Sequence, residues 1–161
     1  MQNRKDCQDL LLDLQLTRFS DELRTKTSAG KRWIWDTVRQ KWLVLQPEEL
    51  VRQLLVQYLL LEKGVSKNRL AIERGLTVND LQKRCDILVY SSAMEPWLLV
   101  ECKAPQVRLS PATFRQITIY NRPLQVPYLL VSNGPESYCA QIHLTDGTFT
   151  FLEEVPDFPA G

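Results

Sequence analysis

Two acidic residues and a lysine stand at spacings that could build a metal-assisted catalytic site. Asp86 lies in the run RCDILVY, and Glu101 and Lys103 lie in VECKAP; both runs are apolar segments that predict β-strands. The loop Ser91 to Pro96 separates them, and a symmetric hairpin about its centre would place Asp86 opposite Glu101. Opposed side chains of an antiparallel pair lie about 4.5 to 5.5 Å apart at Cβ and share a face. The sequence therefore predicts that the two carboxylates converge.

This convergence favours a divalent cation, because like charges placed directly opposite one another destabilise a strand pair unless something positive lies between them. Magnesium is typically held by one or two carboxylates together with substrate phosphates. Lys103 follows Glu101 by two residues and so returns to the same face, where its ammonium could stabilise negative charge developing on a phosphate. The opposing interpretation is that these are three ordinary exposed strand charges, and a one-residue shift of register would separate them.

The surrounding sequence predicts an α/β domain whose elements follow the order αβββαβ. The first helix opens at Gln46-Pro47-Glu48-Glu49 and stops at Gly64, since proline and acidic residues suit a first turn and glycine suits a helix end. The remaining elements are three strands over residues 70–76, 84–90 and 97–103, a helix over 111–120 and a strand over 126–132. We expect a mixed central sheet flanked by helices on both faces. Cys85, Ile87 and Val89 should then share an apolar face away from Asp86.

The two ends of the chain are less regular. Residues 1–30 form a polar lead-in segment that we expect to be loosely packed, with one short helix over residues 9–16. Residues 32–36 and 41–45 predict two strands or a hairpin, and residues 137–144 and 148–155 predict a hairpin at the C-terminal end. We therefore divide the chain into the lead-in, 1–30, and a single domain, 31–161.

The composition is that of a globular domain and excludes several classes of protein. The chain has 161 residues, of which 44% are apolar and 24% charged, and no apolar run approaches the roughly 20 residues that a membrane helix requires. No signal peptide is recognisable, so we expect a cytoplasmic protein that does not engage membranes. The net charge of +1 argues neither for nor against nucleic acid. The four cysteines stand singly and are expected to be reduced and mostly buried.

These motifs resemble the PD-(D/E)XK nuclease superfamily, and more narrowly the N-terminal nuclease domain of type I restriction enzyme R subunits. The similarity extends from Lys31 to Asp157. The residues that match the family's motif are Glu49 in PEELVRQ, Asp86 in RCDILVY, Glu101 and Lys103 in VECKAP, and Gln116 and Tyr120 in QITIY. The resemblance implies a restriction-endonuclease-like sandwich, Mg²⁺ or Mn²⁺ as cofactor, DNA as substrate, and partner subunits or a homo-oligomer.

Two departures from the family's pattern bear on function. Cys85 replaces the proline that often precedes the aspartate, and the sequence ends at Gly161 without room for a helicase motor, so we expect no DNA translocation from this chain. Our leading hypothesis is an endonuclease-like domain that hydrolyses DNA phosphodiester bonds with the help of a metal ion. The alternative is a non-catalytic or partner-dependent module that binds DNA or assists assembly on the same fold.

Several further residues have both a functional and an ordinary interpretation. Glu49 could help to bind the metal, or could simply stabilise the helix dipole from the first turn. Gln116 and Tyr120 could orient the catalytic lysine or contact a DNA phosphate, or both could satisfy local hydrogen bonds on a helix surface. Arg52 and Arg84 are candidate phosphate ligands, although arginines this scattered are often only solvated charges. The same applies to Arg108, Arg115 and Arg122.

The aromatic residues and the single histidine receive no role in catalysis. Trp33, Trp35 and Trp42 are expected to pack in the core or in their hairpin rather than to stack with nucleic-acid bases. His143 lies far from the acidic motif in the sequence, and we assign it no function.

Overall fold

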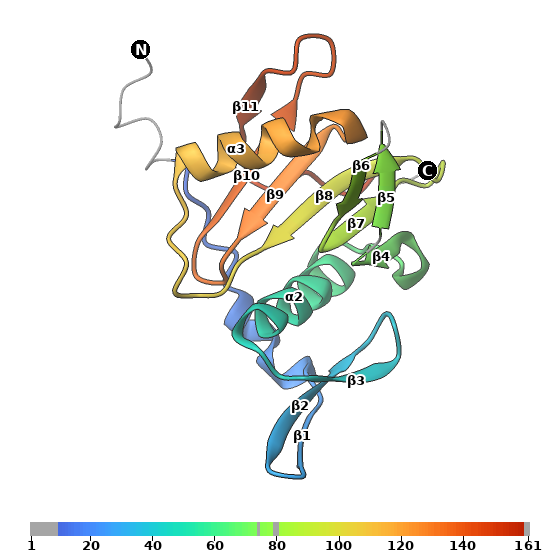
Figure 1. Cartoon of the computed structure of the whole chain (residues 1–161), viewed down its shortest axis with the longest axis vertical. Helices are drawn as coiled ribbons and strands as arrows, with labels where there is room; N and C mark the ends of the chain where they lie inside the picture. The colour runs from blue at the N-terminus through green and yellow to red at the C-terminus, as the bar shows by residue number, and fades with distance from the viewer. Residues whose placement is uncertain (1–9, 74, 79–80, 160–161) are drawn as a thin grey trace.

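A six-stranded mixed sheet forms the centre of the protein, in a computed structural model that describes residues 10–73, 75–78 and 81–159 (Figure 1). Its strand order is β11-β10-β9-β8-β7-β4, with β8 and β9 parallel and the other neighbours antiparallel. The strands are β4 (Leu70–Ile72), β7 (Ile87–Tyr90), β8 (Pro96–Cys102), β9 (Tyr128–Ser132), β10 (Ser137–Ile142) and β11 (Phe149–Phe151). The strand predicted over residues 126–132 and the C-terminal hairpin are confirmed, the second strand of that hairpin being shorter than expected.

Both predicted helices are present and begin where the sequence indicates. Helix α2 (Pro47–Gln57) has proline in its first turn followed by Glu48 and Glu49, and it continues as a π-helical turn, η2 (Tyr58–Glu62). Helix α3 (Pro111–Asn121) is capped by Ser110, whose Oγ accepts the backbone N–H of Thr113 at 3.1 Å. A 3₁₀ turn, η4 (Arg122–Leu124), follows α3. No helix in the described part of the chain is long and apolar enough to cross a bilayer.

The two helices cover opposite faces of the central sheet. Alternate residues of β7 and β8 belong to different apolar clusters: Ile87 and Val100 pack with α2, whereas Leu88 and Leu99 pack with α3. This arrangement confirms the mixed α/β architecture with helices on both sides. The expectation that Cys85 shares a face with Ile87 is wrong, since Cys85 lies in the cluster beneath α3.

The reason for this change of face is a break in two of the predicted strands. Residues 70–76 form β4 and then β5 (Gly75–Val78), and residues 84–90 are split between β6 (Leu81–Arg84) and β7. Glu73 adopts a left-handed backbone conformation with φ of 49°, and its N–H donates to the carbonyl oxygen of Asp86 at 3.0 Å. The break therefore falls directly beside Asp86. The break divides one hairpin into two stretches, because β4 pairs with β7 and β5 pairs with β6 in one continuous register.

A separate three-stranded antiparallel sheet lies beyond α2, on the side away from the central sheet (Figure 1). It contains β1 (Thr25–Ser28), β2 (Lys31–Asp36) and β3 (Lys41–Val44). The β2–β3 hairpin was expected, whereas β1 was not. The boundary that we drew between residues 30 and 31 falls within the β1–β2 turn, where Ala29 and Gly30 both have positive φ, as a tight hairpin turn requires.

The part of the lead-in from residue 10 onwards is packed rather than loose. Leu14, Leu16 and Phe19 are buried in the cluster that covers α2, and Leu12 forms a β-bridge with Ser137. The expected helix over residues 9–16 is wrong for the part that the structure describes, because this bridge holds the chain extended and a 3₁₀ helix, η1 (Leu16–Glu22), begins only afterwards. Residue 9 lies outside the described range.

Candidate active site

The pairing of β7 with β8 determines which side chains meet at the site. Ile87 pairs with Val100 and Leu88 with Leu99, which is the register predicted from the symmetric loop. The register shifts only near the turn, between Val89 and Tyr90. The same register leads to Asp86 and Glu101 as the next opposed residues, and the backbone N–H of Cys102 donates to Oδ2 of Asp86 at 2.8 Å. The Asp86 carboxylate is therefore fixed against the end of β8, next to Glu101.

The two carboxyl groups interact strongly. Burial, the negative charge of Asp86 and a hydrogen bond between the two side chains together raise the pKa of Glu101 to about 8. The ammonium of Lys103 acts in the opposite direction but does not cancel these effects. At neutral pH the pair therefore tends to retain one proton between its two carboxyl groups. Such a pair would bind either that proton or a cation.

Lys103 directly follows β8 and is half-buried. Its backbone N–H donates to the carbonyl oxygen of Ser132 at the end of β9, at 2.8 Å, which extends the parallel pairing by one residue. The effect of its ammonium on the pKa of Glu101 shows that the side chain lies within electrostatic reach of that carboxylate. Asp86, Glu101 and Lys103 are thus gathered at one end of β8, as the sequence predicts.

Glu49 is held in a different set of contacts. It is 7% exposed and lies 3.0 Å from Nε of Arg52 and 3.5 Å from an Nη atom of Arg39. Its contact with Arg52 is close but not aligned as a hydrogen bond, so the attraction is mainly between charges. Burial raises the pKa of Glu49, and the two arginines offset part of this effect.

The same two arginines bind Glu73. Arg39 contacts one carboxylate oxygen of Glu73 at 3.0 Å and Arg52 contacts the other at 2.8 Å, and hydrogen bonding to Arg52 lowers the pKa of Glu73. Arg39 is itself held by the fully buried Asp36, 2.6 Å away. We call these five residues, Asp36, Arg39, Glu49, Arg52 and Glu73, the charge network. It joins the β2–β3 turn and α2 to the backbone bend that supports Asp86.

The remaining candidate residues are placed as follows. Arg52 is 6% exposed and paired with two acids, so it is buried rather than presented to solvent. Gln116 is exposed on α3. The side chains of Arg84 and Tyr120 lie outside the described part of the structure. Within that part, no three acidic, histidine or cysteine side chains are grouped as metal ligands, so Glu49 does not join Asp86 and Glu101 in such a group.

Arg39 and Glu73 belong to the charge network but are not among the residues that the sequence singles out. Arg39 stands in the polar turn Thr37–Gln40, and Glu73 lies within what reads as a continuous strand. Their contact spans 34 positions in the chain, and a single sequence carries no signal for such a pair. Both residues become relevant only through the fold that brings them together.

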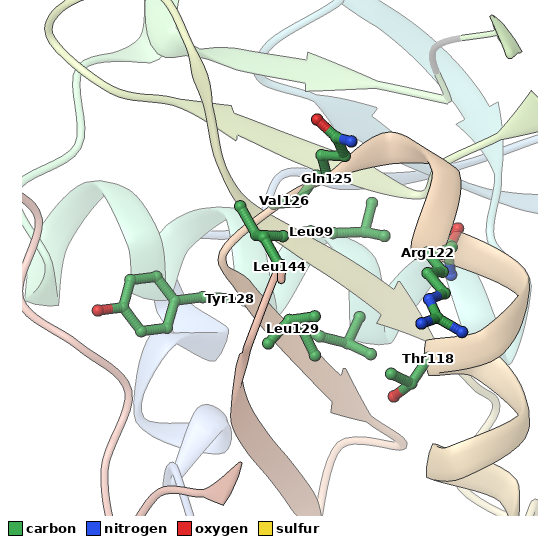
Figure 2. A pocket seen from close by; sticks show the side chains of 10 residues that line it. Leu99, Thr118, Arg122, Gln125, Val126, Tyr128, Leu129 and Leu144 are labelled. Carbon is green, nitrogen blue, oxygen red and sulfur yellow. The ribbon is translucent and has the colours of Figure 1, made fainter. Parts of the chain in front are cut away.

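A small hollow elsewhere in the protein has no part in this site. It lies between the C-terminal end of α3, η4 and the start of β9, and Figure 2 shows Leu99, Val126 and Leu129 around it together with Arg122. Asp86, Glu101 and Lys103 do not line it. Arg122 donates a hydrogen bond to the carbonyl oxygen of Asp146 at 2.8 Å, which links η4 to the loop before β11.

Stability should reveal the strained carboxyl pair in the absence of divalent metal. The folded protein retains a proton on Glu101 up to about pH 8, whereas the unfolded chain releases it near the usual glutamate pKa of 4.5. Between these values a rise in pH therefore favours unfolding.

We expect the free energy of unfolding to decrease over this range, and Glu101→Gln to remove the part of the decrease that arises from the raised pKa of Glu101. Urea denaturation in a chelating buffer at several pH values tests this, with the exposed Glu154→Gln as control; identical profiles for wild type and Glu101→Gln would contradict it.

Removal of Arg52 should destabilise the fold because it leaves Glu49 buried beside only one, more distant, arginine. Breaking a buried ion pair from one side typically costs 3 to 5 kcal/mol, and we expect a loss of about 3 kcal/mol for Arg52→Ala. The exposed Arg115→Ala should change stability by less than about 0.5 kcal/mol. Chemical denaturation measures both variants. Equal, small effects would show that the charge network does not support the fold.

Comparison with known proteins identifies the family of the chain. A family model described as the type I restriction enzyme R protein N terminus (HSDR_N) matches residues 47–156, a range that begins at α2 and includes Asp86, Glu101 and Lys103. No curated protein matches the chain significantly. The family match covers well over half of the sequence. The chain therefore belongs to the family of type I restriction enzyme R protein N-terminal domains.

Proposed function

We propose that this domain is a metal-dependent endonuclease-like domain with a restriction-endonuclease-like fold, which hydrolyses DNA phosphodiester bonds with Asp86, Glu101 and Lys103. The observation that carries the proposal is the convergence of the two carboxylates at the end of β8, with a lysine beside them. Family membership supports a nuclease-related activity on DNA alongside partner subunits. The order of helices and strands around the mixed sheet is compatible with such a fold.

The donor set fits Mg²⁺ or Mn²⁺. Carboxylate oxygens are the ligands that these ions prefer, and two that share one proton at neutral pH provide a site where a divalent cation would relieve their repulsion. Asp86 and Glu101 would hold the ion. When bound, it would polarise the scissile phosphate and lower the pKa of the attacking water.

The protein's own groups would then orient the metal ligands and stabilise the charge that develops on the phosphate. The N–H of Cys102 keeps Asp86 in a fixed orientation, so that little reorganisation is needed when substrate arrives. Lys103 lies close enough to Glu101 to place its ammonium near negative charge that develops on the phosphate. Gln116, Tyr120 and Arg84 remain candidates for positioning the lysine and binding DNA.

A second function is favoured by the state of Glu49. Its carboxylate is engaged by Arg39 and Arg52 instead of being grouped with Asp86 and Glu101. A domain with this arrangement could bind DNA or a partner subunit and depend on that partner for turnover. Such a module would not bind Mg²⁺ or Mn²⁺ in a way that depends on Asp86, and calorimetric titration of wild type and Asp86→Asn separates the two functions.

Cleavage assays test the proposal directly. Supercoiled and linear DNA are incubated with the protein and Mg²⁺ or Mn²⁺, and the rate is compared among wild type, Asp86→Asn, Glu101→Gln and Lys103→Ala. Loss of one group that stabilises transition-state charge typically lowers the rate by about 100- to 1000-fold, and we expect this for Lys103→Ala. The exposed Lys67→Ala serves as a matched control. Equal rates for wild type and all three site variants would refute the catalytic assignment.

A further inference from the structure

The three-stranded sheet presents a face that the catalytic proposal does not use. Side chains alternate across β2 and β3, so Ile34 and Asp36 point to one side and are fully buried, while Trp33 and Trp35 point to the other. Trp42 lies opposite Trp35 in the β2–β3 pairing and therefore shares its face. All three tryptophans are only half-buried.

Two cations lie on this tryptophan face. Arg24 is placed opposite Trp35 by a backbone hydrogen bond of 2.8 Å, and its guanidinium carbon lies 4.9 Å from the centre of the Trp35 ring. Lys26 pairs with Trp33, and its Nζ lies 4.3 Å from the centre of the Trp42 ring. Arg24 and Lys26 are both exposed. The rings thus hold the cationic groups at the surface by cation–π contacts while leaving them accessible.

Two of the aromatic rings contact each other, and a hydrogen bond holds the third. Trp35 and Trp42 meet edge to face with ring centres 5.4 Å apart, and Nε1 of Trp33 donates to the carbonyl oxygen of Ser28. Val44, opposite Trp33, is also exposed and extends the apolar surface. The hairpin packing expected for these tryptophans is therefore present, but it takes place on the outer face of the sheet.

The charge of this segment indicates an anionic partner. Between residues 24 and 44 the sequence has six basic residues against a single acid, Asp36, whereas the whole chain has a net charge of only +1. Asp36 is buried on the opposite face and bound to Arg39, so it does not reduce the positive charge of the tryptophan face. Three of the six, Arg24, Lys26 and Lys31, share the tryptophan face by strand pairing and alternation. Arg32 and Lys41 fall on the Asp36 face, and Arg39 is bound in the charge network.

We propose that the outer face of the β1–β3 sheet binds single-stranded DNA: Arg24 and Lys26 move from the ring faces of Trp35 and Trp42 to phosphates, and Trp33, Trp35 and Trp42 stack with unpaired bases. Neighbouring aromatic rings flanked by exposed cations form the type of surface that binds single strands, because unpaired bases expose their flat faces and duplex bases do not. The choice of DNA over other nucleic acids rests on the proposed function. The binding surface itself is made of residues outside the carboxylate site.

The test measures binding without cleavage. A fluorescent single-stranded oligonucleotide is titrated with Asp86→Asn protein in a chelating buffer, so the result does not depend on catalysis. Trp42→Ala should weaken binding roughly 5- to 150-fold, the range for loss of one base–aromatic stack, and Trp42→Phe should weaken it less. Arg24→Ala and Lys26→Ala should each reduce the slope of log affinity against log salt by about 0.7. The exposed Lys67→Ala, outside this sheet, should change neither quantity.

Thermal melting of each variant establishes that it is folded before binding is compared, and Trp42→Phe, Arg24→Ala and Lys26→Ala provide the test if Trp42→Ala fails to fold. Equally tight binding of a duplex of the same sequence would overturn the stacking, as would a wild-type affinity that none of the folded variants reduces. Absence of oligonucleotide binding would overturn the proposal and favour a protein partner for this face. None of these results decides whether Asp86 and Glu101 support cleavage.

Discussion

The carboxylate site depends on the register of one antiparallel strand pair. With Ile87 opposite Val100, the chain brings Asp86 beside Glu101 and allows the Cys102 N–H to bind the Asp86 carboxylate. A shift of one residue would point one of the two acids into the apolar layer under a helix and would separate the pair. The apolar residues of β7 and β8, packed alternately under α2 and α3, make that shift costly. Core packing thus maintains two like charges in a position they would not otherwise occupy.

The charge network also supports the carboxylate site, through contacts that come from α2 and the β2–β3 turn. The β4–β5 and β6–β7 hairpin bends at Glu73, whose N–H holds the backbone of Asp86 and whose carboxylate is clamped by Arg39 and Arg52. The β1–β3 sheet therefore also supports the site, because Arg39 lies in its β2–β3 turn. One end of the β1–β3 sheet contributes to the support of the carboxylate site, while its outer face presents tryptophans and cations to solvent.

Much of the site could be predicted because its determinants are local. The apolar runs around Asp86 and Glu101 and the short loop between them define a symmetric hairpin, and Pro47, Gly64 and Ser110 mark the helix ends. The break at Glu73 could not be predicted, since residues 70–76 read as one strand and the bend is stabilised by contacts distant in sequence. Strand β1 was missed because Thr25–Ser28 is polar and exposed along its whole length, without the alternation that indicates a strand.

The central claim is that Asp86 and Glu101 together bind a divalent cation. Anomalous diffraction from crystals grown or soaked with Mn²⁺ addresses it most directly, because manganese gives an element-specific signal at its own position. We expect one anomalous peak between the two carboxylates at the end of β8, and no peak there in Asp86→Asn crystals treated in the same way. A peak elsewhere, or none at the carboxylates at a saturating Mn²⁺ concentration, would contradict the account and leave a fold without the proposed metal site.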